Sequence, residues 1–385
     1  MRIALVTESF MPDVNGVAHS VVRTAEHLLR TGHEPLVIAP VPAPGPVPAT
    51  LPYPVVRIPS IPMPGYPQIR LGLPKLPALR AAIRAHDADV VHLASPFVLG
   101  AWARTAATKL DLPTVAVYQT DVAAYARARN LGVCEDLSWR WIRRLHNRAT
   151  RTLAPSTESV TALHRHGVER VHLWRRGVDD VRFHPGRRSA GVRRALCGDG
   201  EVLVGYVGRL AVEKEIDLLA GVTRLPGVRL VVVGDGPAGA TLRKALPRAT
   251  FLGARHGGQL ARIYASLDVF AHTGPFETFG QTVQEAMASG VPVVAPARGG
   301  PCDLVRDGST GFLVPPHEEA GFTAAVATLA ADPGLRRRMG ATGRTAIGGR
   351  SWTAVGDQLL GHYAQVLGET LPAVPKIFRR RAAAA

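Results

Sequence analysis

Two glutamates, Glu277 and Glu285, stand eight positions apart where a predicted strand passes into a predicted helix. The strand covers residues 269–271. A helical pattern runs over residues 281–289, and Gly290 ends it with the left-handed conformation typical of a helix C-terminus. Glu277 therefore lies on the loop at the carboxyl end of a strand, and Glu285 lies about one turn inside the following helix.

The start of this helix is a candidate anion site. Its first backbone N–H groups have no partner within the helix, and the helix dipole adds partial positive charge there, so an anion such as a phosphate is favoured. The two carboxylates are then placed to bind polyhydroxylated groups on either side of that phosphate. Two surface glutamates, one of them assisting a helix start, would show the same spacing. The N–H groups in question belong to Gly280, Gln281 and Thr282.

A second predicted loop in this half of the chain carries Arg209 and Lys214, five positions apart. It follows a buried strand predicted over residues 203–207. Both side chains can reach one diphosphate, Arg209 through a bidentate fork and Lys214 as a point charge. Glu213 offers an alternative, because it could form an ordinary surface ion pair with Lys214.

The loop after the first predicted strand is a third candidate site. Gly16 stands in an Asn-Gly-Val sequence that begins a helix running to about Arg30. A glycine in this place lets a ligand approach the backbone closely. A simple turn glycine fits the same pattern.

Hydrophobic runs bounded by turn residues alternate with helical patterns through both halves of the chain. This alternation predicts an α/β fold with two doubly wound parallel sheets, whose ligands bind at the carboxyl ends of the strands. The predicted domains cover residues 1–180 and 187–350, and a basic tail over residues 371–385 is predicted to be disordered. The strands predicted in the first half are Ile3–Val6, Leu36–Ala39, Val55–Ile58, Val90–Leu93, Thr114–Val117, Thr152–Ala154 and Val171–Trp174.

Composition places the chain among globular proteins. Of its 385 residues, 46% are apolar and 20% are charged, and no apolar run is long enough to span a membrane. The chain reaches Glu8 too soon for a secretory signal. Three scattered cysteines support neither a disulfide framework nor a metal cluster, so a reducing cytoplasm is expected.

The formal net charge is +16, and arginine supplies nearly all of it, because only five of the 46 basic residues are lysine. Such a surface attracts anionic polymers or anionic lipid. Two stretches, Ile61–Leu76 and Trp139–Arg148, interleave basic with apolar and aromatic side chains, as membrane-touching segments do. Either stretch could instead be an element packed on its own domain, and the arginine content could reflect genome composition. No recognised nucleic-acid-binding module is present, so no nucleic-acid partner is expected.

The whole stretch from Glu277 to Ala295 resembles the Glu-x7-Glu signature of the family 4 retaining glycosyltransferases, which have the GT-B fold. The resemblance extends over about residues 1–367. It implies two Rossmann-like domains facing each other across a cleft, with the nucleotide sugar mostly on the second domain and the acceptor mostly on the first. A last helix, residues 351–367, is expected to fold back onto the first domain. In this family the first glutamate contacts the transferred sugar and the second contacts the nucleotide ribose.

The resemblance assigns further roles. The Gly-Arg…Glu-Lys loop neutralises the donor diphosphate, the loop with Gly16 approaches it, and Arg255 lies where the nucleobase binds. Many relatives carry a histidine that faces the reacting sugar in the loop after the fifth predicted strand. This chain has Gln119 and Asp121 there, and Asp121 is assigned to that place. The implied catalytic residues are Glu277 and Asp121, and the implied donor-binding residues are Gly16, Arg209, Lys214, Arg255, Phe279, Gly280, Gln281, Thr282 and Glu285.

Within the family, the opening from Glu8 to Val17, the Gln-Thr-Asp at residues 119–121 and Phe279 resemble actinobacterial GDP-mannose-dependent α-mannosyltransferases that act on lipid acceptors. The implied enzyme moves mannose from GDP-mannose to a lipid-linked or glycan acceptor, and it is cytoplasmic and peripheral on the inner face of the cell membrane. No metal or other cofactor is expected. The Asp-Ala-Asp at residues 87–89 matches a metal motif of another glycosyltransferase fold, but a buried strand follows at once, which favours a helix-to-strand turn.

Two alternatives remain. The same fold could use a UDP- or ADP-sugar and a soluble acceptor. An NAD-dependent oxidoreductase would explain Gly234-x-Gly236-x-x-Gly239 directly after a strand, which has the form of a dinucleotide fingerprint. However, no acidic residue ends a strand about twenty residues further on. The oxidoreductase also leaves the glutamate pair and the Arg–Lys pair without a role.

Overall fold

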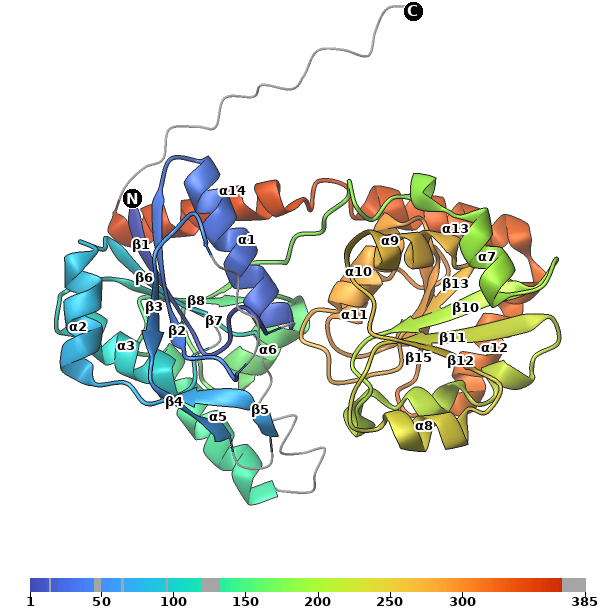
Figure 1. The fold of residues 1–385 in the computed structure, drawn as a ribbon, viewed down its shortest axis with the longest axis horizontal. Coiled ribbons are helices and arrows are strands. Elements are labelled where there is room, and N and C mark those ends of the chain that lie inside the picture. The colour runs from blue at the N-terminus through green and yellow to red at the C-terminus, as the bar shows by residue number, and fades with distance from the viewer. Residues whose placement is uncertain (14, 45–49, 64–65, 95, 120–131, 369–385) are drawn as a thin grey trace, which may run out of the picture.

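Two parallel sheets, each covered by helices, form two domains that lie side by side (Figure 1). The computed structural model describes residues 1–13, 15–44, 50–63, 66–94, 96–119 and 132–368. Among these residues the first sheet has the strand order β3-β2-β1-β6-β7-β8-β9, and the second has the order β12-β11-β10-β13-β14-β15. Every pairing within the two sheets is parallel. The predicted α/β fold with two doubly wound sheets is confirmed.

The central strands of the first domain are continuous buried runs, as expected where helices cover both faces of a parallel sheet. Every residue of β6 is buried, and so is all of β1 after its first residue. The seven strands predicted in this half all form, with ends that differ by at most two residues. The elements are β1 (Arg2–Thr7), α1 (Gly16–Arg30), β2 (Glu34–Pro40), β3 (Val55–Ile58), β4 (Ser60–Met63), β5 (Tyr66–Gly72), α2 (Leu76–Ala85), β6 (Val90–Ala94), α3 (Val98–Thr108), β7 (Thr114–Val117), α5 (Gly132–His146), β8 (Arg151–Ala154), α6 (Thr157–Arg165) and β9 (Val171–Leu173).

The second domain repeats this plan. Its strands β10, β13 and β14 are buried throughout. Among the described residues, no helix of either domain is both long and apolar enough to cross a membrane. The elements are α7 (Ala190–Leu196), β10 (Val202–Val207), β11 (Val228–Val233), α8 (Gly239–Ala245), β12 (Thr250–Gly253), α9 (Gly257–Ser266), β13 (Val269–Ala271), α10 (Gln281–Ala288), β14 (Val293–Pro296), α11 (Pro301–Leu304), β15 (Gly311–Val314), α12 (Glu319–Ala331) and α13 (Pro333–Ala346), followed by α14 (Trp352–Leu367).

Each sheet reverses its strand order at one point, between β1 and β6 in the first domain and between β10 and β13 in the second. Ligands of doubly wound sheets bind beside the loops that leave the strands there. The loop after β10 carries Arg209 and Lys214, and the loop after β13 carries Glu277. The loop after β1 leads to Gly16. The topology therefore brings residues from all three candidate loops to the two switch points.

The chain passes between the domains twice, and the two passages run side by side. In the first passage, after β9, the Val178 N–H donates to the Arg350 carbonyl of the return passage (2.9 Å). After the return, α14 packs against α1 of the first domain. The Trp174 indole N–H donates to the Val355 carbonyl of α14 (3.0 Å). Tyr363 of α14 completes the core of the first domain.

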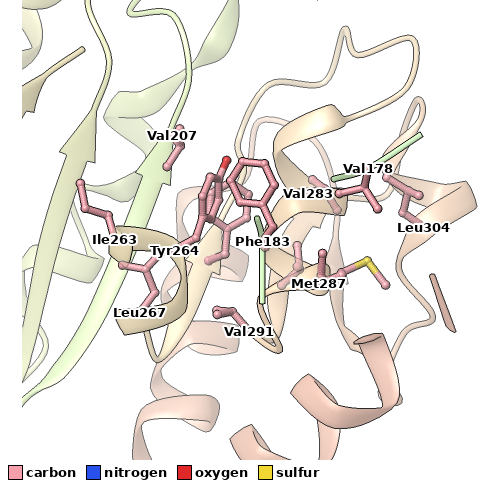
Figure 2. Packing of buried hydrophobic residues seen from close by; sticks show 14 of the residues in the cluster. Val178, Phe183, Val207, Ile263, Tyr264, Leu267, Val283, Met287, Val291 and Leu304 are labelled. Atoms are coloured by element: carbon pink, nitrogen blue, oxygen red, sulfur yellow. The ribbon is translucent and has the colours of Figure 1, made fainter. Parts of the chain in front are cut away.

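An apolar cluster fixes the first passage to the second domain (Figure 2). Phe183, on that passage, packs edge-on against Tyr264 of α9, with ring centroids 5.5 Å apart. Val283 and Met287 bring the buried face of α10 into the same cluster. The helix that carries Glu285 is therefore attached to the passage between the domains.

Proline is frequent between β2 and α2, and the described residues of this stretch are largely non-helical. The stretch forms β3 and an antiparallel hairpin of β4 with β5 before α2 begins. Arg70 of β5 donates to the hydroxyl and the carbonyl of Ser60 in β4 (3.0 and 2.9 Å). Arg70 thus links the two strands of the hairpin.

Tyr363→Phe is expected to destabilise the protein by about 1–3 kcal/mol, because the buried His92 ring would lose a hydrogen-bond partner. The Tyr363 hydroxyl and His92 Nδ1 are 2.7 Å apart, and burial lowers the pKa of His92 to about 3, so the ring stays neutral. Urea unfolding measures the loss. Tyr53→Phe is the control, since the buried Tyr53 hydroxyl has no hydrogen-bond partner among the described residues. Equal losses in both variants would show that the hydrogen bond between Tyr363 and His92 does not stabilise the protein.

Candidate functional site

An ion pair between Lys214 and Glu277 joins the loops after β10 and β13. The two side chains are 15% and 23% exposed, so both lie mostly out of water. The Thr273 hydroxyl donates to the Lys214 carbonyl (2.5 Å), which fixes the lysine backbone. Gly274 leaves room for the lysine side chain, because a Cβ at this position would lie 3.1 Å from the Lys214 Cδ.

Glu277 is held in its ionised form. Burial by itself raises the pKa of the carboxyl, but Lys214, the nearby His272 ring and Arg176 outweigh this effect and lower the pKa to about 2. Burial lowers the pKa of His272 to about 4. At neutral pH the Glu277 carboxylate therefore accepts hydrogen bonds, for which sugar hydroxyls are suitable donors.

α10 begins at Gln281, four positions after Glu277. Gly280 adopts a left-handed conformation (φ 92°) before the helix, and among the described residues no side chain caps the helix start. The Phe279 side chain is buried in the apolar cluster below, and a Cβ on Gly300 would overlap the Phe279 backbone. Phe279 and Gly280, both predicted to bind the donor, can therefore do so only through the backbone. Thr282, the second residue of α10, can offer its backbone N–H group beside them.

Glu285 lies on the next turn of α10 in a different electrostatic environment. Burial raises the pKa of its carboxyl to about 7, and the neighbouring Tyr264 and Gln281 side chains oppose this rise only in part. Gln281 also donates from Nε2 to the Gly177 carbonyl of the first passage (3.1 Å). The two glutamates of the pair thus differ at neutral pH, because Glu277 is ionised and Glu285 is near its pKa.

Arg209 and Lys214 lie on the same loop but have different carboxylate partners. Arg209 is 44% exposed and pairs with Glu213 at 2.5 Å. The predicted alternative, an ion pair of Glu213 with Lys214, is wrong, because Lys214 pairs with Glu277 instead. Arg255 is exposed on the loop after β12, where its guanidinium donates to the adjacent Ala254 carbonyl (2.9 Å).

The first domain brings Gly16 to the interface between the domains. The Asn15 side chain caps α1, its Oδ1 accepting from the N–H groups of Val17 and Ala18 (3.0 Å each). The Gly16 carbonyl accepts from the buried guanidinium of Arg176 (3.1 Å). Gly16 is therefore linked to the passage between the domains.

Gln119 is the residue of the loop after β7 that the structure brings to the second domain. Its backbone carbonyl accepts from the Thr278 hydroxyl (3.2 Å), and Thr278 follows Glu277 directly. Asp121, the predicted catalytic residue of this loop, lies outside the described residues. Gln119 was placed in the loop where many relatives carry a histidine, but the catalytic role there was assigned to Asp121, and Arg176 and His272 were not predicted as site residues. The local signal for Gln119 is its position two residues after the end of β7, whereas the contacts of Arg176 and His272 come from distant elements.

The glycines of the Gly234-x-Gly236 motif serve contacts between loops. Both have positive φ angles (139° and 155°). A Cβ on Gly234 would overlap the Gly208 carbonyl, and one on Gly236 would overlap the Leu210 carbonyl. The motif therefore lets the loops after β10 and β11 pack backbone against backbone, and it needs no dinucleotide to account for it.

Asp87 and Asp89 form the turn between α2 and β6, at the edge of the sheet opposite the candidate loops. The Arg2 guanidinium bonds the Asp87 carboxylate (2.5 Å), and the Arg2 N–H bonds that of Asp89 (2.6 Å). Both carboxylates are thus engaged by one residue. Within the described ranges, no group of three or more His, Cys, Asp or Glu residues is arranged to hold a metal ion.

Removing Lys214 alone is expected to destabilise the protein more than removing both members of its ion pair, because Glu277 would keep a desolvated charge without its cation. A cycle of Lys214→Met, Glu277→Gln and the double variant should give a coupling energy of about 1–3 kcal/mol in urea unfolding. Additive losses would show that the two charges do not interact. Arg209→Met with Glu213→Gln is the control cycle for a more exposed pair.

Two family models together match most of the chain. "Glycosyltransferase Family 4" matches residues 14–182, and "Glycosyl transferases group 1" matches residues 193–346. A GDP-mannose-dependent alpha-mannosyltransferase of Mycobacterium tuberculosis is 49% identical over 96% of this chain and 97% of its own length. The protein of that name from Corynebacterium glutamicum is 43% identical over 95% of this chain and 89% of its own length.

Solved structures share the arrangement of both domains. Sucrose-phosphate synthase from Thermosynechococcus elongatus matches with a TM-score of 0.79 and 23% identity, over 95% of this chain and 99% of that chain. Anabaena HepE in complex with UDP-glucose matches with a TM-score of 0.76 and 21% identity, over 95% and 100%. These likenesses establish the fold, and the near-full-length relatives establish the family. The chain belongs to the family 4 glycosyltransferases, with the GT-B fold.

Proposed function

We propose that the protein is a retaining α-mannosyltransferase that transfers mannose from GDP-mannose to a lipid-linked or glycan acceptor. The Lys214–Glu277 pair beside the start of α10 carries the proposal, because it puts a cation, a carboxylate suited to sugar hydroxyls and backbone donors together. The relatives named GDP-mannose-dependent alpha-mannosyltransferase, 43–49% identical to this chain, support the choice of donor.

The reaction breaks the bond between the anomeric carbon and the diphosphate oxygen, and a bond from the acceptor oxygen replaces it. The leaving nucleoside diphosphate takes the electron pair and gains negative charge. Arg209, Lys214 and the N–H groups at the start of α10 stabilise that charge, without a metal ion. The acceptor proton passes to the leaving phosphate oxygen on the same face of the sugar, which retains the anomeric configuration.

Glu277 orients the sugar. Its low pKa keeps it ionised, so it accepts hydrogen bonds from sugar hydroxyls and does not donate a proton. Its charge also lies close to the position where the anomeric carbon becomes oxocarbenium-like. Glu285, one turn further along α10, accepts from the ribose hydroxyls. This arrangement differs from that of a retaining glycosidase, in which two carboxyl groups act as acid and nucleophile.

The acceptor side of the proposal rests on one surface of the first domain. This surface, called here the α5 face, consists of Leu137, Arg140, Trp141, Arg144 and Arg148. Leu137 and Trp141 are 56% and 42% exposed, while the opposite side of α5 packs on its own domain. Each arginine near an anionic surface contributes about 1 kcal/mol, so a few suffice for reversible attachment. We propose that this face docks on anionic membrane and thereby brings a lipid acceptor to the site.

The donor is tested by direct transfer. The purified protein is expected to transfer sugar from GDP-mannose, with the α-configuration retained, and to do so in excess EDTA. Labelled GDP-, UDP- and ADP-sugars are incubated with lipid extracts and with soluble glycans, and proton NMR gives the anomer of the product. Turnover of UDP- or ADP-sugars alone, an inverted product, or activity that needs magnesium or manganese would each contradict part of the proposal.

Glu285→Gln is expected to weaken GDP binding by about tenfold, the loss of hydrogen bonds to a charged group. Because the pKa of Glu285 is about 7 and ribose hydroxyls donate to the ionised form, wild-type affinity should rise between about pH 6 and pH 8. Calorimetry at several pH values measures both effects. The variant should keep only the pH dependence of GDP itself. Identical curves for the two proteins would rule out the ribose role.

Replacing Arg140, Arg144 and Arg148 with glutamine is expected to abolish most binding to vesicles that contain anionic lipid, and added salt should do the same to the wild type. Co-sedimentation measures the bound fraction. The control carries the same change at three exposed arginines of the second domain, Arg194, Arg248 and Arg337. Equal loss in both variants would indicate an evenly spread charge. Binding to neutral vesicles, or none to anionic ones, would favour a soluble acceptor.

A further inference from the structure

Arg176 is a buried cation at the centre of the contacts between the domains. It lies on the first passage, with 8% of its surface exposed. Its guanidinium donates to the Gln119 side-chain oxygen (2.6 Å) and to the Gly16 carbonyl (3.1 Å). Its own carbonyl accepts from the Gln284 amide of α10 (3.1 Å). Burial lowers the pKa of Arg176 to about 10, and the charge of Glu277 opposes that change, which places the two charged groups near each other.

The contact with Arg176 determines which way the Gln119 amide points. A guanidinium can only donate, so the atom of Gln119 that it contacts must be the oxygen, and Nε2 must lie on the other side. The Gln119 carbonyl is fixed at the same time by Thr278, the residue after Glu277. Among the residues that the structure describes, none accepts a hydrogen bond from Nε2. Arg176 thus fixes the direction in which the two N–H groups of the Gln119 amide point.

The glycine loop of the first domain depends on the same guanidinium. A Cβ at Gly16 would lie 2.6 Å from Arg176 Nη1, closer than any unstrained contact. Alanine at position 16 would therefore push the guanidinium away from the Gly16 carbonyl and from Gln119. This clash allows the position of Arg176 to be disturbed without changing Arg176 itself.

We infer that Arg176 is a positioning residue for the transfer reaction, which orients the Gln119 amide so that Nε2 donates to a hydroxyl oxygen of the transferred sugar. Gln119 then holds the sugar from the first domain, while Glu277 holds it from the second. Arg176 touches neither the sugar nor the acceptor. The inference rests on the proposed function for the identity of the sugar, but it applies to whichever nucleotide sugar the enzyme turns over.

A double-variant cycle tests the inference. Arg176→Met and Gln119→Met are each expected to lower kcat on the order of 100-fold, the effect of misplacing a reacting group, with KM and GDP affinity changed only a few-fold. The double variant should be no worse than either single variant, because the two residues act as one unit. Arg188→Met is the control, since Arg188 also donates to two carbonyls, those of Ala265 and Leu267, and lies away from the site.

Three further variants separate positioning from simple support of the fold. Gly16→Ala should reproduce the kcat loss of Arg176→Met, and Arg176→Lys should recover part of the rate. Gln119→Glu keeps an acceptor for Arg176 but has no side-chain N–H to donate. Its thermal midpoint should therefore return from that of Gln119→Met to the wild-type value, while its kcat should stay low. Losses that multiply in the double variant, or full activity of Gln119→Glu, would overturn the inference. If the wild type turns over another nucleotide sugar, the proposed donor is wrong, but the same comparisons still decide the role of Arg176.

Discussion

The desolvated charge of Glu277 is the constraint on which the rest of the site depends. A carboxylate that is mostly out of water needs a cation, and Lys214 supplies it from a different loop. The two loops can meet because β10 and β13 are hydrogen-bonded neighbours at the point where the strand order reverses. An ammonium group has three donors, so Lys214 can keep its bond to Glu277 and also donate to a phosphate oxygen. The ion pair therefore aligns both groups before any ligand arrives.

The helix that follows Glu277 connects this pair to the first domain. Gln281 and Gln284 of α10 donate to two successive carbonyls of the passage between the domains (3.1 Å each). The Thr278 hydroxyl reaches the loop after β7 (3.2 Å). Because these contacts begin within one turn of the predicted phosphate site, a ligand bound there touches the element that also holds the two domains together. The position of the domains and the geometry of the site are thus parts of one hydrogen-bonded network.

Local patterns in the sequence were sufficient for the elements and for the loops that carry the site. The strands of the first half and the helix after Glu277 were predicted correctly because their hydrophobic spacing and end signals lie within a few residues. Contacts between distant residues left no such signal. The partner of Glu213, the burial of Phe279 and the link from Arg176 to Gln119 all depend on how separate elements pack. Gly234 is a further example. In the sequence, a glycine that is required because a neighbouring backbone packs against it looks the same as one required by a bound dinucleotide.

The return of α14 to the first domain makes that domain discontinuous along the chain, and this has a consequence for synthesis on the ribosome. Val355, Leu359 and Tyr363 pack in the same core as Ile3 and Leu5. The residues of the second domain, by contrast, form one uninterrupted segment between the two passages. A nascent chain can therefore complete the core of its second domain while one side of the first is still exposed to solvent. The usual order, in which the N-terminal domain finishes first, is reversed for the last step.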